Sequence, residues 1–329
     1  NEVVNRLAHQ LVAEGVSPGQ NVAVLMPNSP EFAFLIHVLA RLRAILVPLN
    51  IRLSQKELAW QVNLSKSAFI ICSDQTSTMA TQLPAKLVNI QSLSGCASAG
   101  TSPPWPSLDL DATQAIVYTS GTTGHPKGAM LTYGNHFYGA VASAFRLGTE
   151  SATRWLVSLP LYHVGGMAII WRCCLYGTTA VLLRQFPSET IIKALNSQKI
   201  SLVSVVPTIL YRLVDDHVSQ IKTPDLRCIL VGGAALPALL AQKCIEFELP
   251  VATTYGLTEA ASQVATAAPA DVIRKPGSVG QPLMFTAIRI VNMAGQTLPV
   301  GEIGEIVVSG PTVMAGYYDQ PDAARQTLR

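Results

Sequence analysis

One stretch of the sequence combines hydroxyl groups, glycines and a lysine in an order suited to phosphate. It reads YTSGTTGHPKG, from Tyr118 to Gly128, and it follows the apolar run 115–117. Glycines let the backbone turn and approach a ligand closely, and successive backbone N–H groups in such a loop can bind an anion. We therefore predict a loop that holds the phosphates of a nucleotide. The residues expected to contact them are Thr119, Ser120, Gly121, Thr122, Thr123, Gly124 and Lys127.

This loop is not of the Walker A type. That motif places Lys directly after Gly and a hydroxyl residue directly after Lys, whereas here Pro126 precedes Lys127 and Gly128 follows it. Segments rich in Ser, Thr and Gly are more often plain surface loops. The ordered series of hydroxyls, glycines, proline and lysine after an apolar strand favours phosphate binding.

Two later stretches place glycines after an apolar segment. Ser158 to Gly166 reads SLPLYHVGG and carries His163, although a lone His among apolar residues is more often a core residue. Leu230 to Pro237 reads LVGGAALP and is, by itself, an ordinary turn from a strand into a helix. Ligands of open α/β sheets bind beyond the carboxyl ends of the strands, so this position suits binding.

A third stretch, TYGLTEAAS, supplies a hydroxyl and a carboxylate. We expect a strand to end at Tyr255 and Gly256 to make a tight turn, followed by Thr258 and Glu259. Glu259 could equally be a solvated acid at the start of a helix, where the helix dipole favours it.

Arg172 stands in an otherwise apolar segment, IIWRCCLYG. A buried Arg needs an anionic partner, because an unpaired buried charge is strongly destabilising. The partner could be an internal Asp or Glu, or a carboxylate of a substrate bound by two parallel hydrogen bonds. The residues alone leave both interpretations open.

The composition indicates a large buried core. Of the 329 residues, 49% are hydrophobic and 13% are charged, which is about half the usual charged share of ~25%. The net charge is +3 and no run is rich in Lys or Arg, so no nucleic-acid partner is expected. The most apolar region, 155–183, contains Pro, Gly, His and Arg, and this mixture argues against a membrane span.

The cysteines and the N-terminus favour a cytoplasmic protein. None of the six cysteines forms a C-x-x-C pair, so we interpret them as reduced core residues. The first 15 residues are amphipathic, without a basic lead or a long apolar core, so no signal peptide is expected. The chain does not begin with Met and is expected to belong to a longer protein. The sequence leaves open whether it forms a homo-oligomer.

The elements that must position these residues alternate between strands and helices. This alternation predicts an α/β fold with mostly parallel sheets. Ser54 and Glu57 predict a capping box for a helix that runs through Asn63. The expected strands are 22–26, 45–49, 68–72, 155–158, 179–183, 202–206, 228–231 and 251–255, and the clearest helices are 30–44, 135–145, 187–197 and 237–247.

The chain changes character at two places. Residues 73–111 are irregular and predict a break between two sheet subdomains within an α/β core of residues 1–269. Beyond this core, the short strands 288–291 and 305–309 are separated by Gly and Pro turns without a helix. This pattern predicts that residues 270–329 begin a small antiparallel, β-barrel-like subdomain.

The four motif stretches together resemble the signatures of the adenylate-forming superfamily, the AMP-binding enzymes that include the acyl-CoA synthetases. They occur in that superfamily's order, and GEIGEIVVSGPTVMAGYY at Gly301–Tyr318 resembles a structural signature of it. The resemblance covers essentially the whole chain. It implies the large N-terminal domain of the adenylate-forming fold, with two packed, mostly parallel sheets and a small barrel-like subdomain. The superfamily's ribose-binding Asp, and its C-terminal lid domain with a catalytic Lys, are expected to be absent from this chain.

The resemblance also implies roles for the matching residues. Tyr255 would stack on adenine and Glu259 would hold Mg²⁺. The implied catalytic residues are Lys127, His163, Thr258 and Glu259. The implied ATP-binding residues are those of the phosphate loop together with Gly233, Ala234, Tyr255, Gly256 and Thr258. The implied substrate-binding residues are His163, Arg172, Gly232 and Gly256.

The implied reaction is the ATP-dependent activation of a carboxylic acid and its transfer to coenzyme A, with Mg²⁺. Such a reaction needs charge neutralisation and positioning more than a protein nucleophile. Four segments are most similar to the corresponding sequences of the ligases of menaquinone biosynthesis, whose substrate is an aromatic keto acid with two carboxylates. These segments are SLPLYHVGG, WRCCLYG, SVVPTILYRL and YGLTEAASQV. The second carboxylate would then be the partner of Arg172. The alternatives are a CoA synthetase for medium-chain or benzoate-like acids, and a nucleotide-binding protein without ligase activity.

Overall fold

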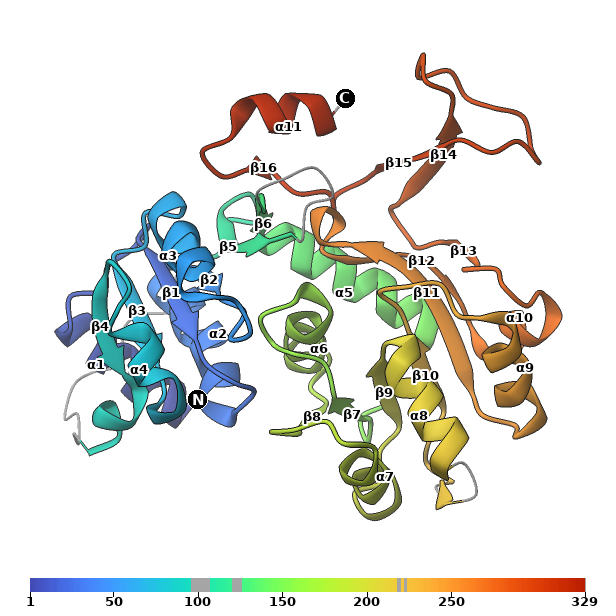
Figure 1. Cartoon of the computed structure of the whole chain (residues 1–329), viewed down its shortest axis with the longest axis horizontal. Coiled ribbons are helices and arrows are strands. Elements are labelled where there is room, and N and C mark those ends of the chain that lie inside the picture. Colours follow the sequence, from blue (N-terminus) through green and yellow to red (C-terminus); the bar gives the residue numbers. More distant parts are fainter. Residues whose placement is uncertain (96–106, 120–125, 218–219, 222–223, 329) are drawn as a thin grey trace. The chain divides into compact units, whose positions relative to one another are not determined.

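The computed structural model describes residues 1–95, 107–119, 126–217, 220–221 and 224–328. The chain forms two compact units, each built on a seven-stranded sheet (Figure 1). The first unit contains residues 1–133, 160–167 and 314–329, and the second contains residues 134–159 and 168–313. The prediction of an α/β fold with two mostly parallel sheets is confirmed. The predicted domain boundary after residue 269 stays a prediction.

The first sheet is parallel at its centre and antiparallel at one end. Its strands are β1 (Asn21–Leu25), β2 (Ile45–Pro48), β3 (Phe69–Cys72), β4 (Lys86–Asn89), β5 (Thr113–Tyr118), β6 (Gly128–Thr132) and β16 (Gly316–Tyr317). They lie in the order β16-β6-β5-β2-β1-β3-β4. The first five strands of the chain pair in parallel, and β6 pairs antiparallel with both β5 and β16.

Helices cover both faces of this sheet, and their amphipathic patterns explain which side chains they bury. Leu58 and Val62, one turn apart, pack from α3 (Gln55–Leu64) onto strand residues such as Val47 and Ile70. The predicted capping box is confirmed, since the Ser54 hydroxyl accepts from the Glu57 N–H and the Glu57 carboxylate accepts from the Ser54 N–H. The other helices of this unit are α1 (Glu2–Ala13), α2 (Pro30–Leu42), α4 (Ser77–Ala80) and α11 (Pro321–Thr327).

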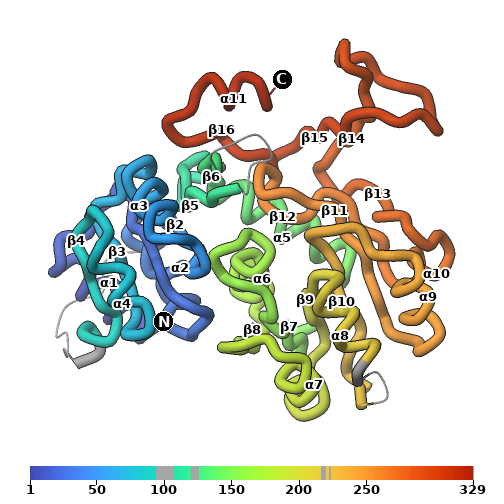
Figure 2. The backbone as a smooth tube through the Cα atoms, viewed as in Figure 1, coloured from blue at the N-terminus to red at the C-terminus, as the bar shows by residue number. Residues whose placement is uncertain are grey.

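Near its C-terminal end, the chain returns to the first sheet (Figure 2). In β16, Tyr317 pairs with Ala129 of β6, and the Tyr318 N–H donates to the Gly128 carbonyl at 2.8 Å. The amide of Asn21 donates to the Tyr318 hydroxyl at 3.0 Å. The first sheet therefore joins residues from both ends of the chain.

The second sheet follows the same plan. Its strands are β7 (Arg154–Val157), β8 (Thr179–Leu182), β9 (Leu202–Val205), β10 (Cys228–Val231), β11 (Val251–Leu257), β12 (Ser262–Ala267) and β13 (Gln281–Pro282). They lie in the order β13-β12-β11-β10-β9-β7-β8. β7 to β11 are parallel, and β12 and β13 form the antiparallel end.

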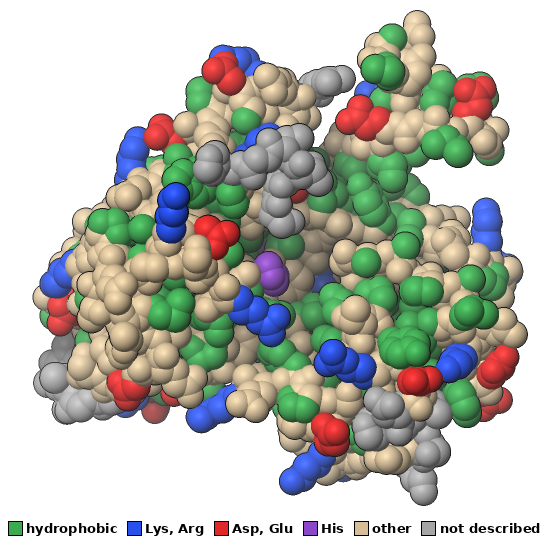
Figure 3. Space-filling model, in the orientation of Figure 1, with side chains coloured by type: hydrophobic (Ala, Val, Ile, Leu, Met, Phe, Trp, Pro, Cys, Tyr) green, Lys and Arg blue, Asp and Glu red, His purple; other side chains and the backbone are tan. Residues whose placement is uncertain are grey.

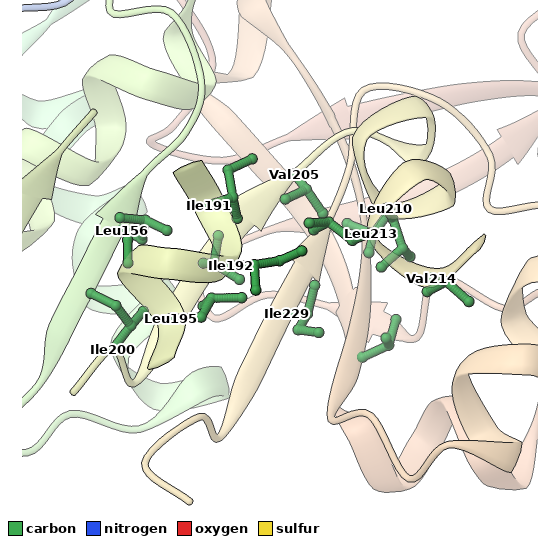
Figure 4. Close-up of a cluster of buried hydrophobic side chains, with 14 of the residues drawn as sticks. Leu156, Ile191, Ile192, Leu195, Ile200, Val205, Leu210, Leu213, Val214 and Ile229 are labelled. Carbon is green, nitrogen blue, oxygen red and sulfur yellow. The ribbon is translucent and has the colours of Figure 1, made fainter. Parts of the chain in front are cut away.

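Three helices cover one face of the second sheet with a continuous apolar core (Figure 4). They are α7 (Ser188–Ser197), α8 (Pro207–His217) and α9 (Ala238–Glu246). Leu156, Val205 and Ile229 point from the strands toward Ile191 and Leu210 of these helices. Because successive strand residues face opposite sides, Trp155 and Ser204 face away from this core. That second face carries α6 (Val164–Tyr176), and α5 (Tyr133–Leu147) contacts α6.

The last part of the second unit is a short antiparallel pair, β14 (Ala287–Val291) with β15 (Glu305–Ser309). The predicted antiparallel strands are thus confirmed, and among the described residues the pair stands as a two-stranded sheet. α10 (Pro269–Arg274) precedes it.

On the face drawn in Figure 3, Lys and Arg side chains lie scattered among uncharged ones. None of the described helices has the length and hydrophobicity that crossing a membrane requires.

Candidate functional site

Lys127 lies at the base of the predicted phosphate loop, which joins β5 to β6. The Thr119 N–H donates to the Lys127 carbonyl at 2.9 Å and closes this base. Nζ of Lys127 lies 5.2 Å from the centroid of the Tyr317 ring, which is within the range of a cation–π interaction. A Cβ at Gly128 would lie 2.7 Å from a side-chain carbon of β5, which explains the glycine there. Ser120, Gly121, Thr122, Thr123 and Gly124 lie outside the described residues.

His163 belongs to the first unit and directly precedes α6. Its N–H donates to the Pro160 carbonyl, and its own carbonyl accepts from the N–H groups of Gly166 and Met167. The imidazole is exposed and lies edge-on to the Tyr162 ring, at 4.8 Å between centroids. Partial burial lowers the pKa of His163, and the positive charge of Arg52 lowers it further. The imidazole is therefore neutral at neutral pH and can both donate and accept a hydrogen bond.

Two of the predicted site segments lie side by side in the second unit. Gly232 follows β10, and a Cβ there would lie 2.8 Å from the Thr254 methyl group of β11. Gly233 has a φ of +81°, a left-handed conformation that favours glycine. Gly233 and Ala234 are exposed. The carboxyl ends of these parallel strands therefore present an open backbone next to the start of the Tyr255–Glu259 segment.

The expectation that a strand ends at Tyr255 with a turn at Gly256 was wrong. β11 continues through Gly256 to Leu257, and its register against β12 shifts between Tyr255 and Gly256. A Cβ at residue 256 would lie 1.8 Å from the Ser262 carbonyl oxygen. Glycine is needed for this close approach of two strands, which sequence alone cannot distinguish from a turn.

The turn itself is the short 3₁₀ segment η4 (Thr258–Ala260). Ala261 and Ser262 after it have φ values of +50° and +107°, so the chain reverses within a few residues. Thr258 and Glu259 are half-buried at this turn. In the described residues, no group of three or more His, Cys, Asp or Glu side chains could hold a metal ion. A metal at Glu259 would thus take most of its ligands from a substrate and water, which is the usual way Mg²⁺ is bound.

Arg172 is buried among aromatic side chains of the second unit. It is 3% exposed, and its guanidinium carbon lies 5.5 Å from the centroid of the Trp155 ring. Nε of Arg172 has no hydrogen-bond partner, and no carboxylate lies within ion-pair distance, in the part of the chain that the structure describes. Burial lowers the pKa of Arg172. No Asp or Glu among the described residues is therefore the anionic partner of Arg172.

No sequence pattern indicates the side chains that surround Arg172. Trp155 donates from Nε1 to the Ser204 hydroxyl at 3.0 Å, and the Ser158 hydroxyl donates to the Ser204 carbonyl. His136 of α5 stacks on Trp171, the residue before Arg172. His136 lies 36 residues from Arg172, so no spacing rule connects them. The only available signal in the sequence is a His within the largely apolar segment that forms α5.

The predicted site residues are thus divided between the two units. Lys127 and His163 belong to the first unit, while Arg172, the Gly232–Ala234 segment and the Tyr255–Glu259 segment belong to the second. Within the second unit the structure brings the last two segments together. Arg172 lies over β7 of the same sheet.

Comparison with known proteins gives consistent results. Residues 1–318 match the AMP-binding enzyme family. A curated 2-succinylbenzoate–CoA ligase from Bacillus cereus is 37% identical over 333 aligned residues, which cover 100% of this chain and 67% of the relative.

Two solved structures of o-succinylbenzoate CoA synthetase from Bacillus subtilis have similar folds. The complex with the acyl-adenylate intermediate OSB-AMP superposes with a TM-score of 0.94 at 33% identity, covering 99% of this chain and 66% of that one. The complex with ATP and magnesium ion has a TM-score of 0.90 at 33% identity, covering 99% and 68%. The chain therefore spans about two thirds of the length of these relatives.

Proposed function

This chain belongs to the AMP-binding enzyme family, and we propose that it serves the ATP-dependent activation of o-succinylbenzoate and its transfer to coenzyme A. A carboxylate oxygen of the acid attacks the α-phosphate of ATP, which forms the acyl-adenylate and releases pyrophosphate. The thiol of coenzyme A then attacks the acyl carbon, forms the thioester and releases AMP. The relatives named for this acid, and their complexes with ATP, magnesium and the adenylate, support the proposal.

The observation that carries the choice of acid is the buried Arg172 without a carboxylate partner among the described residues. o-Succinylbenzoate has two carboxylates, and activation uses one of them. The other stays negatively charged and would supply the anion that Arg172 lacks. A fatty acid or a simple benzoate has no second carboxylate, so binding it would leave the buried charge unpaired, which is unfavourable.

We propose that the remaining site residues act on ATP. Lys127 neutralises phosphate charge, and the Thr258 hydroxyl donates a hydrogen bond to a phosphate oxygen. Gly233, Ala234 and Tyr255 hold the adenine. His163, neutral and able to donate or accept, orients the reacting carboxylate. These roles are positioning and charge stabilisation, which is what displacement at phosphorus requires.

Glu259 is the proposed ligand of Mg²⁺. A half-buried carboxylate at a tight turn fits a cation that takes one or two protein oxygens and the rest from phosphates and water. When bound, the cation offsets the negative charge of the triphosphate. We also propose a cytoplasmic location, where ATP and coenzyme A are available. The described cysteines carry free thiols, which agrees with a reducing compartment.

The test is acid-dependent exchange of pyrophosphate into ATP by the full-length protein. It compares o-succinylbenzoate, benzoate and octanoate. A strong preference for o-succinylbenzoate is expected. Preference for either monocarboxylate would overturn the choice of acid while keeping the reaction, and ATP binding without exchange for any acid would favour a nucleotide-binding protein without ligase activity.

A further inference from the structure

The helices α5 and α6 contact each other at two places near Arg172. The Tyr176 hydroxyl donates to the Ala140 carbonyl and joins the two helices at one level. One turn earlier, the His136 ring stacks on the Trp171 ring, with 5.3 Å between centroids and 15° between planes. Residues four apart share one face of a helix. His136 therefore lies at the level of Trp171 and Arg172, on the face of α5 that meets α6.

His136 and Arg172 share one property, a buried side-chain nitrogen without a hydrogen-bond partner among the described residues. His136 is 4% exposed and Arg172 is 3% exposed. In the part of the chain that the structure describes, Nε2 of His136 and Nε of Arg172 have no hydrogen-bond partner. Most buried polar groups of proteins are hydrogen-bonded, because leaving one unsatisfied is destabilising. Two such nitrogens at one level of a helix pair indicate a shared partner that accepts hydrogen bonds.

The charges around the two side chains indicate what that partner is. Burial and the positive charge of Arg172 lower the pKa of His136 to about 3, so its imidazole is neutral at neutral pH. Burial raises the pKa of Tyr176 on the same helix face and of the neighbouring Cys173, so both are neutral as well. Arg172 is thus the charged member of this group. An acceptor with one negative charge would satisfy both nitrogens and neutralise the site.

We infer that His136 is a specificity-determining residue that forms, together with Arg172, one buried subsite for the carboxylate that is not activated. Arg172 supplies the charge, and Nε2 of His136 supplies a neutral hydrogen bond. Stacking on Trp171 fixes the plane of the imidazole, so little conformational freedom is lost on binding. This inference rests on the proposed function, because it concerns the second carboxylate of o-succinylbenzoate.

The test uses two replacements of His136 in the full-length protein. His136→Phe keeps a ring that can stack and removes the nitrogens, and His136→Gln keeps an N–H donor. The measurement is kcat/KM for pyrophosphate exchange with o-succinylbenzoate and with benzoate. We expect His136→Phe to lower the value for o-succinylbenzoate by about tenfold or more, as expected for a hydrogen bond to a charged group, and to change the value for benzoate less than about twofold. His136→Gln should recover most of the loss.

Two further variants serve as controls. His37→Gln replaces a half-buried His whose pKa is also lowered by burial, in α2 of the first unit, and should leave the preference between the two acids unchanged. His136→Leu offers a smaller apolar replacement if the Phe variant does not fold, and the same selective loss is expected.

The outcomes separate this inference from the proposed function. Equal losses for both acids would overturn the inference and leave His136 as a packing residue. An unchanged kcat/KM for o-succinylbenzoate in His136→Phe would also overturn it, with the proposed function intact. Absence of exchange with o-succinylbenzoate in the unaltered protein would refute the proposed function itself.

Discussion

Replacing Arg172 by Met should make the protein more stable and less selective. Arg172 is 3% exposed, and Trp155 provides its cation–π contact. Replacing a buried ion pair by apolar side chains of similar volume often stabilises a protein by about 1–4 kcal/mol. We expect a comparable gain from removing the buried charge of Arg172, which has no carboxylate partner among the described residues. The lost cation–π contact offsets about 0.5–2 kcal/mol of that gain. We expect a net gain of about 1–2 kcal/mol, or a rise in Tm of about 2–8 °C at roughly 2–4 °C per kcal/mol.

The same replacement should remove the anchor for the second carboxylate. Truncating one partner of a buried charge pair weakens binding by about 2–5 kcal/mol, so kcat/KM for o-succinylbenzoate should fall at least about 30-fold, while the value for benzoate stays within about threefold. Urea unfolding measures the first effect and pyrophosphate exchange measures the second. Arg212→Met, which changes an exposed Arg of α8, is the matched control. Lower stability together with equal losses for both acids would refute the reasoning and assign Arg172 to structure alone.

Four other changes test separate parts of the molecule. Gly256→Ala should destabilise the protein by at least about 2 kcal/mol in a urea titration, because its Cβ would lie 1.8 Å from the Ser262 carbonyl oxygen. Gly139→Ala in α5 is the control. Its Cβ would have no neighbouring atom nearer than 3.8 Å, so this variant should be neutral or stabilising in the same titration. Lys127→Ala should lower pyrophosphate exchange about 100-fold, the effect of losing one preorganised donor, and unchanged exchange would remove Lys127 from the phosphate site. Glu259→Gln should raise the Mg²⁺ concentration needed for half-maximal exchange about tenfold, whereas an unaltered metal response would exclude Glu259 as the ligand. Finally, the free energy of unfolding should fall as the pH drops below about 6.5. Only the unfolded chain binds a proton at His136 until the pH reaches the folded-state pKa of this residue, about 3. His136→Gln should make the free energy of unfolding less dependent on pH, and identical pH curves for the variant and the unaltered protein would contradict the burial of a neutral His.

Local patterns were sufficient to predict most elements of the two sheets. The capping box at Ser54 and Glu57 and the strand at Cys228–Val231 depend on near neighbours and on a continuous apolar run. The function of Gly256 was misjudged because its constraint comes from the carbonyl of Ser262 on another strand. The surroundings of Arg172 could not be predicted from the sequence either, since Trp155, Ser204 and His136 come from three other elements.

The same limit applied to β16. Nothing in the alternation of strands and helices indicates that Tyr317 would pair with Ala129, because the pairing depends on a return of the chain over a long distance. The division into two units also follows from such returns, as residues 160–167 and 314–329 join the first unit. Motifs identified the chemistry of individual segments, and long-range pairing decided which segments share a unit.

The position of β16 has a consequence for synthesis on the ribosome. β16 emerges roughly 180 residues after β6, a delay on the order of ten to forty seconds at ~5–20 residues per second. During that interval the backbone of β6 presents an unpaired edge, which other chains can extend. The second unit consists of residues 134–159 and 168–313, so its last residue is made before the strand that completes the first. The unit that contains the N-terminus is therefore the later of the two to be completed, and the edge of β6 lacks its β16 partner until Tyr317 is made.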